Sequence, residues 1–210
     1  MKKFNKVLVL APHPDDGEFS CGATIKKLIE EGAEVLYVMF STCEKSIPKG
    51  FDKDVLIKEL NLAVSKLGIN KNQIIKFDFP VREFPKYRQE ILDELIKLRN
   101  IHNPDLILLP NSNDIHQDHK TINQEGIRAF KHYNILGYEL PWNSQTFTAN
   151  FHVAISKNHL KAKWRAISQY KSQKRRPYFN EDFFNGLAVV RGTQANVKYA
   201  EAFELIHWNL

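Results

Sequence analysis

The sequence predicts an α/β fold in which a mostly parallel, doubly wound sheet carries helices on both faces. Strand-length apolar runs alternate with longer segments whose apolar residues recur at helical spacing, four times in succession. The short runs are apolar on both alternating faces, as expected of strands that helices cover on both sides. Hydrophobic residues make up 43% of the 210 residues and charged residues 26%, which is ordinary for a globular protein.

The first strand–helix unit has the clearest boundaries. Residues 6–11 form the first expected strand, and this strand must stop because Pro12 and Pro14 cannot donate hydrogen bonds to a neighbouring strand. Ser20 is a candidate N-cap for a helix over residues 21–31, whose apolar residues lie on one helical face.

The later elements follow from the same patterns. Asp52 is a candidate N-cap of the second helix, and Gly68 is a candidate residue just beyond its end. The expected strands cover residues 33–41, 73–77, 106–110, 135–140 and 147–155, and the expected helices cover residues 53–67, 86–102, 120–132 and 157–170. We expect one domain over residues 1–210, in which the part from about residue 134 shapes the substrate pocket.

Composition excludes several classes of protein. No apolar run approaches the roughly 20 residues that a membrane span needs, and the first apolar run is too short for a signal peptide. Cys21 and Cys43 lie at no metal-like spacing, and a disulfide framework is not expected. The expected compartment is therefore the cytoplasm, and a homo-oligomer is compatible with the sequence.

The formal net charge is +6, with one local basic cluster at Lys171, Lys174, Arg175 and Arg176. A solvated surface is the favoured interpretation of this cluster, and an anion site is the alternative. The sequence contains no nucleic-acid-binding motif, so we expect no nucleic-acid partner. The charge mildly favours a small-molecule substrate that is anionic or phosphorylated.

Two polar segments follow buried strands. Residues 13–18 contain one histidine and three acids, and residues 111–119 contain two histidines and two aspartates. Both segments come directly after an expected strand, at the edge of the sheet where open α/β folds bind ligands. The first strand and the strand across the crossover point are neighbours in a doubly wound sheet, so we expect the two segments to meet.

Together these segments have the donors of a catalytic metal site. Histidine and carboxylate ligands suit zinc, and a catalytic zinc keeps three protein ligands plus a water. His13, Asp16 and His119 can supply two nitrogens and one oxygen. Asp15 is then free to act as a general base, and His116 can polarise or protonate the reacting group. The implied reaction is hydrolysis of an unactivated carbonyl bond, such as an amide.

Asp118 is expected to hold a ring nitrogen of His116 and to set its tautomer.

Several of these residues also have a simpler interpretation. His13 alone is more often a capping or hydrogen-bonding residue than a ligand. Asp15 or Asp16 alone is more often a carboxylate favoured by the dipole at a helix entry. The pairing of two such clusters at equivalent strand ends is what favours the metal.

The chain resembles the PIG-L/LmbE-like N-acetylglucosaminyl deacetylases. The resemblance is carried by HPDD at residues 13–16, CGATI at residues 21–25 and HQDH at residues 116–119, and it covers most of the chain. It implies a Rossmann-like, three-layer fold and removal of an acetyl group from an N-acetylated amino-sugar conjugate. It also implies the ligands and roles given above, with zinc as the metal and Fe²⁺ as the alternative. Gly17, between the aspartates and Glu18, departs from the common pattern.

Candidate substrate contacts lie outside the two motifs. Arg82 and Arg88 can reach sugar hydroxyls or a phosphate, with surface salt pairing equally open, and Glu18 is a further candidate. Four aromatic residues are most simply core residues, with a sugar-stacking wall as the alternative: Tyr178, Phe179, Phe183 and Phe184.

Two other functions stay open. The first is a metal hydrolase of another amide or ester, and the second is a non-catalytic sugar- or nucleotide-binding module with the same fold. Asp15 argues against the binding module, which needs no base beside a metal. A dinucleotide site is disfavoured because no G-x-G-x-x-G follows the first strand.

Overall fold

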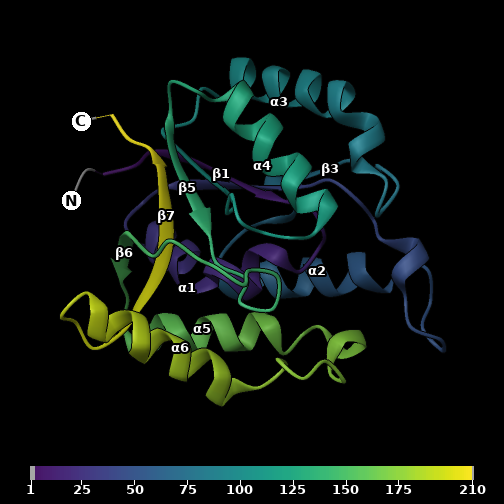
Figure 1. Ribbon diagram of the computed structural model, residues 1–210. Helices are drawn as coiled ribbons and strands as arrows, with labels where there is room; N and C mark the ends of the chain where they lie inside the picture. Colours follow the sequence, from purple (N-terminus) through teal and green to yellow (C-terminus); the bar gives the residue numbers. More distant parts are fainter. Residues whose placement is uncertain (1–2, 210) are drawn as a thin grey trace.

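Residues 3–209 are described by the structure, a computed structural model (Figure 1). Within these residues, seven strands form one sheet in the order β3-β2-β1-β4-β5-β7-β6. The strands are β1 (Lys6–Ala11), β2 (Glu34–Met39), β3 (Ile74–Lys76), β4 (Leu106–Pro110), β5 (Asn134–Tyr138), β6 (Phe151–Ala154) and β7 (Ala200–His207). The α-helices are α1 (Asp16–Glu30), α2 (Val55–Leu67), α3 (Arg88–His102), α4 (Gln117–Ala129), α5 (Lys157–Ile167) and α6 (Glu181–Gln194).

The sheet is parallel from β3 to β5 and becomes antiparallel at one edge. β1 pairs in parallel with both β2 and β4, so Val9 lies between Tyr37 and Leu108. β7 runs antiparallel to both of its neighbours, β5 and β6. The chain order therefore reverses between β1 and β4, and the predicted doubly wound, mostly parallel sheet is confirmed.

Two hydrophobic cores lie on opposite faces of the sheet. In β1, Val7 and Val9 pack into the core shared with α1, α2 and α5, whereas Leu8 and Leu10 pack into the core shared with α3 and α4. Figure 1 shows α3 and α4 on one side of the sheet and the other four helices on the opposite side. The alternation along a buried strand thus produces the three-layer α/β/α arrangement.

The first helix differs from the expected one at its start. We expect a helix over residues 21–31 with Ser20 as its N-cap, but α1 begins at Asp16. The Ser20 hydroxyl instead donates to the carbonyl oxygen of Asp16, at 2.6 Å. A break is present at Cys21, whose φ of −129° and ψ of 27° are not helical. Residues 16–20 are thus an extra turn, and this turn contains Asp16.

A buried ion pair replaces the helical hydrogen bonds that the break removes. The Glu201 carboxylate of β7 accepts from the amides of Ala23 (3.2 Å) and Thr24 (2.6 Å). The Lys163 ammonium of α5 donates to the Ser20 carbonyl at 2.8 Å and to Glu201 at 2.6 Å. Because both sides of the break are capped in this way, the turn that contains Asp16 is fixed by two distant elements.

Helix α4 also starts earlier than expected. The helix predicted over residues 120–132 covers Gln117–Ala129, because His116 is its N-cap. The shift of three residues places His119 inside the first turn, with its side chain 2% exposed. The polar residues before the apolar stretch are therefore part of the helix.

The remaining differences are mostly at boundaries. Helix α2 follows Asp54 instead of Asp52. Its end at Gly68 is as predicted, and Gly68 has a φ of 104°. A 3₁₀ turn over Phe84–Tyr87 precedes α3, and β6 is shorter than the strand expected over residues 147–155. The sequence patterns predict no element beyond residue 170, where α6 and β7 lie, and glycines inside α6 weaken its helical pattern. Among the described helices, none combines the length and apolar character that crossing a membrane requires.

Candidate metal centre

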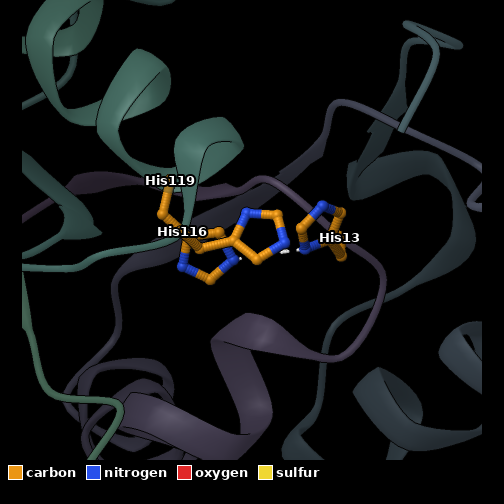
Figure 2. A group of neighbouring side chains, drawn as sticks. All are labelled: His13, His116 and His119. Atoms are coloured by element: carbon orange, nitrogen blue, oxygen red, sulfur yellow. Dashed lines mark hydrogen bonds between the residues drawn. The ribbon is translucent and has the colours of Figure 1, made fainter. Parts of the chain in front are cut away.

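The adjacency of β1 and β4 brings the two polar segments together, as predicted. His13 lies on the turn after β1 and Asp16 opens α1, while His116 and His119 belong to the start of α4. Figure 2 shows the three imidazoles from these two segments converging on one point at the edge of the sheet. Each of the three histidines offers a nitrogen within 4.8 Å of the others.

Three donor atoms form a nearly equilateral triangle. Asp16 Oδ2 lies 3.2 Å from His13 Nδ1 and 3.2 Å from His119 Nε2. The two nitrogens are themselves 3.2 Å apart. Donors about 2.0–2.1 Å from a tetrahedral zinc are separated from one another by about 3.3 Å. The side chains therefore have the spacing of three ligands of one metal ion.

Each imidazole of this triangle is held from behind by a carboxylate. His13 Nε2 donates to Asp118 Oδ2 at 3.0 Å, and His119 Nδ1 donates to Asp114 Oδ2 at 2.7 Å. A carboxylate on the outer nitrogen is the usual partner of a metal-ligating histidine. Asp118 thus orients His13 through its carboxylate, and it also holds a ring nitrogen of His116, as expected, but through its backbone amide at 3.2 Å. The Asp118 carboxylate also accepts from the backbone amides of Arg82 and Phe84, at 2.6 and 3.2 Å.

These outer hydrogen bonds determine whether the inner ring nitrogens carry a lone pair or a hydrogen. When the outer nitrogens hold the hydrogens of neutral rings, His13 Nδ1 and His119 Nε2 point lone pairs at each other and at the Asp16 carboxylate. Three converging lone pairs repel one another unless a cation lies among them. The donor set therefore fits a divalent metal ion.

The same contacts shift the pKa values of the three groups in the metal-free site. Burial disfavours a charged ring, but the Asp16 charge and the hydrogen bonds to Asp118 and Asp16 outweigh burial and raise the pKa of His13 to about 9. The corresponding balance, with Asp114 as the outer partner, raises the pKa of His119 to about 10. Burial likewise opposes ionisation of Asp16, but the two imidazoles hold its pKa well below the usual range.

Asp15 lies on the wall of the same cavity. Its carboxyl group is partly buried, and burial together with the neighbouring Asp16 charge raises its pKa to about 6. No side-chain hydrogen bond or ion pair of Asp15 is found within residues 3–209. Both carboxylates of the pair belong to one turn, yet only Asp16 is held between the imidazoles.

His116 has a defined tautomer because it caps α4. Its Nδ1 accepts from the Asp118 amide at 3.2 Å, so the ring hydrogen of the neutral form is on Nε2. Burial and the charges of His119 and His13 lower the pKa of His116 to about 4. His116 is therefore a neutral hydrogen-bond donor on the cavity wall.

The cluster opens into a cavity of about 360 Å³, a size typical of small-molecule sites. Its lining includes the four residues of the candidate metal centre (His13, Asp16, His116 and His119) and Asp15. The other lining residues include Cys43, Arg82, Trp142, Gln173, Arg176 and Tyr178. The rings of Trp142 and Tyr178 are stacked, with centroids 3.7 Å apart. Part of the lining thus comes from the chain beyond residue 134.

The three candidate substrate contacts have different positions. Arg82 lines the cavity, and its backbone, at φ 68°, donates to Asp118 Oδ2 at 2.6 Å. Arg88 instead pairs with the fully buried carboxylate of Glu125, at 2.5 Å. Glu18 is fully buried and cannot reach a substrate. Arg88 and Glu18 are therefore structural partners rather than cavity residues.

Gly17 is explained by the packing beneath the site. A Cβ atom at Gly17 would lie 2.6 Å from the Tyr37 ring, so only glycine fits there. The Tyr37 and Tyr170 hydroxyls both contact Glu18 and the Pro14 carbonyl, at 2.5–3.0 Å. Burial raises the pKa of Glu18 to about 8 despite these hydrogen bonds. The departure from the common motif thus lets the turn that contains Asp16 pack closely on Tyr37.

Several residues of the site have no role that the sequence patterns predict. Asp114 lies in the second polar segment, five residues before His119, but no motif gives it a role. Trp142 has no signal of its own in the sequence. Tyr178 is packed against the core and also lines the cavity, which combines the two interpretations considered for it. Arg176 belongs to the basic cluster whose favoured interpretation was a solvated surface.

The fold and the donor set define a hydrolase with a candidate metal centre. Comparison with known proteins identifies the family: the PIG-L model, described as GlcNAc-PI de-N-acetylase, matches residues 8–130, more than half of the chain. The chain belongs to this family of N-deacetylases. The predicted family and enzyme class are confirmed, so a non-catalytic binding module is not supported.

Individual relatives agree with this assignment. Diacetylchitobiose deacetylase of Thermococcus kodakarensis is 27% identical to this chain, and the alignment covers 96% of this chain and 83% of the relative. The N,N'-diacetylchitobiose deacetylase structure from Pyrococcus horikoshii has a TM-score of 0.77 at 24% identity, covering 97% of this chain and 84% of that one. A zinc-inhibited teicoplanin deacetylase, Orf2, has a TM-score of 0.75 at 15% identity and covers 95% and 97%. At these identities, the two structures show a shared fold.

Proposed function

We propose that the chain removes the acetyl group from an N-acetylated amino-sugar conjugate and that His13, Asp16 and His119 hold its catalytic divalent metal. The triangle of donor atoms at 3.2 Å supports this ligand set. Zinc is the proposed metal because two nitrogens and one oxygen in a tetrahedral arrangement suit it, with Fe²⁺ as the alternative.

The roles of the other residues follow from their places on the cavity wall. When bound, a divalent metal ion polarises a carbonyl oxygen and lowers the pKa of water to about 7. Asp15, on the wall and outside the triangle, takes the proton of the attacking water and passes it to the departing amine. His116 donates its Nε2 hydrogen to the oxygen on which negative charge develops. Asp118 and Asp114 fix the two ligating rings.

The sugar part of the proposal rests on the relatives and on the cavity. The relatives named above are deacetylases of diacetylchitobiose and teicoplanin. The stacked pair Trp142 and Tyr178 supplies a flat apolar surface beside polar groups of Asn143 and Gln173. A pyranose ring, with apolar C–H faces and hydroxyl edges, matches a wall of this kind.

The test combines metal content with acetate release. Protein purified without chelator is expected to contain about one zinc or iron ion per chain and to release acetate from diacetylchitobiose or a related N-acetyl sugar. A chelator should abolish the release, and added zinc should restore it. His119→Ala should lose both metal and activity, whereas His102→Ala, a histidine outside the cavity, should lose neither.

Two results would contradict the proposal. Hydrolysis of other amides or esters, with no acetate from any N-acetyl sugar, would show that the chain is a metal hydrolase of another amide or ester. Absence of metal and of hydrolysis after zinc is added would show that the two polar segments do not form a hydrolytic site.

A further inference from the structure

A second cavity adjoins the one at the metal centre. It measures about 380 Å³ and shares Ser46, Gln173 and Arg176 with the metal cavity. Because three residues line both, a ligand whose acetamido group lies at the metal centre can extend past Arg176 into the second cavity. The combined space exceeds what one sugar needs, so it can take a conjugate.

The lining of the second cavity is basic. Arg175 and Arg176 line it together with serine, proline and glutamine side chains, and no acidic residue is part of this lining. The carboxylate that contacts the lining is Glu59, which is 5% exposed. Its oxygens are bound by the amide and hydroxyl of Ser172, at 3.0 and 2.5 Å. Arg175 and Arg176 are thus solvent-exposed residues that line the cavity, and its wall contains no acidic residue.

Arg176 differs from the paired arginines of the chain. Arg88 and Arg191 each form an ion pair with a buried carboxylate, Glu125 and Glu139. Within residues 3–209, Arg176 forms no ion pair, and its Nε donates only to Gln173 Oε1, at 3.3 Å. Its charge also acts on Asp15, lowering the pKa of that carboxyl against the larger effect of burial. An unneutralised cation therefore lies between the reacting centre and the second cavity.

The structure divides the basic cluster into two parts. Lys171 and Lys174 line neither cavity and keep the interpretation of a solvated surface. Arg175 and Arg176 line the second cavity. A guanidinium group binds carboxylate or phosphate through paired hydrogen bonds, which a lysine cannot reproduce.

We propose that the group attached to the amino sugar is anionic, with its carboxylate or phosphate bound by Arg176 and Arg175 in the second cavity. This inference rests on the proposed deacetylase function and specifies its substrate class. A neutral conjugate would leave the arginines solvated, whereas an anionic one gains charge-assisted hydrogen bonds that help to hold the acetamido group at the metal centre.

The test compares derivatives of N-acetylglucosamine that carry a small neutral or a small anionic group at the anomeric position. The zinc-loaded enzyme is assayed with the methyl glycoside of N-acetylglucosamine, its carboxymethyl glycoside and N-acetylglucosamine 1-phosphate. The wild type should prefer one or both anionic compounds, and which of them it prefers distinguishes a carboxylate from a phosphate ligand. In Arg176→Gln, the ratio of kcat/KM for the preferred anionic glycoside to that for the methyl glycoside should fall by about 10- to 100-fold.

The ratio cancels any general effect of Arg176 on Asp15, because such an effect acts on both glycosides alike. Lys174→Gln is the matched control, since it removes a neighbouring charge that lies outside both cavities, and its ratio should stay at the wild-type value. Equal ratios in wild type and Arg176→Gln, with the methyl glycoside hydrolysed, would overturn the anion site and leave the deacetylase function standing.

A binding measurement separates the two proposals further. Calorimetric titration of the zinc-loaded protein should show tighter binding of the anionic glycoside than of the methyl glycoside, and Arg176→Gln should remove the difference. Preferential binding without any acetate release would support the anion site while contradicting the deacetylase function. Absence of both turnover and preferential binding would contradict both.

Discussion

The carboxylate behind His119 provides a sharp test of the metal centre. Asp114 Oδ2 accepts from His119 Nδ1 at 2.7 Å, and Asp114 Oδ1 accepts from the His116 amide at 2.9 Å. Asp114 is fully buried, so no solvent can replace either partner. Asp114→Asn keeps the size of the side chain but leaves one acceptor oxygen for two donors.

The expected effect on metal binding is large. Either His119 or the His116 amide must face an NH₂ group, so the ligating ring loses its outer partner or the helix loses its entry hydrogen bond. Removal of the outer partner of a metal-ligating histidine weakens metal binding about 10- to 100-fold. This corresponds to about 1.4–2.8 kcal/mol. An unpaired buried donor also lowers the free energy of unfolding of the metal-free protein by about 1–3 kcal/mol.

Zinc affinity is measured by competition with a chromophoric chelator, and folding is measured separately by urea denaturation of metal-free protein. Asp105→Asn is the control, because Asp105 Oδ2 alone accepts from the amides of Asn5 and Lys6 at the opposite end of β4. A single amide oxygen can keep both bonds, so zinc affinity should not change. Unchanged zinc affinity in folded Asp114→Asn would refute the assignment of His119 as a ligand held by Asp114.

Three further predictions test other parts of the site. Asp15→Asn should retain stoichiometric zinc but lose about 10²–10⁴-fold in kcat, because it removes the general base; equal loss of metal and turnover would make Asp15 a ligand. Lys163→Met should lower the free energy of unfolding by about 3–5 kcal/mol in denaturant titrations, because it leaves Glu201 buried without its cation. If the double variant with Glu201→Gln is as unstable as the sum of both changes, the pair does not act as a unit. Zinc binding to metal-free protein should release protons, since His13 and His119, with pKa values raised to about 9 and 10, are protonated at pH 7. The affinity should therefore rise with pH up to this range, and calorimetry in buffers of different ionisation enthalpy that finds no release at pH 7 would contradict those protonation states.

The fold could be predicted because its main signal is local. Each buried strand of the parallel part is a short apolar run, and Pro12, Gly68 and the helical spacing mark the boundaries. The antiparallel edge gives a weaker signal. β7 is only partly buried in its second half, and α6 contains glycines, so neither matches a simple pattern. Their places depend on pairing with β5 and β6, which no local pattern encodes.

The proximity of the two motifs could be predicted because both follow strands that the topology makes neighbours. The orienting carboxylates could not, because hydrogen-bond partners depend on loop geometry. Asp118 is two residues from His116 in the sequence, yet its carboxylate turns to His13, more than a hundred residues away. The extra turn of α1 cannot be predicted for a related reason, since Glu201 and Lys163 cap its break from distant elements.

The cavity beyond the metal centre depends still more on tertiary structure. Arg176 belongs to a basic run that usually marks a solvated surface, and only the packing of the chain around Gln173 places it between two cavities. Arg88 shows the converse. Its place after β3 makes it a candidate substrate contact in the sequence, but in the structure the buried Glu125 binds its guanidinium group.

The central claim is that one metal ion lies among His13, Asp16 and His119. The most direct test is a crystal structure of the zinc-loaded protein with anomalous diffraction recorded on both sides of the zinc absorption edge. One anomalous peak is expected about 2.0–2.2 Å from His13 Nδ1, Asp16 Oδ2 and His119 Nε2, with His116 outside the ligand set. A peak coordinated by His116 in place of Asp16, or no peak at this edge of the sheet, would contradict the account.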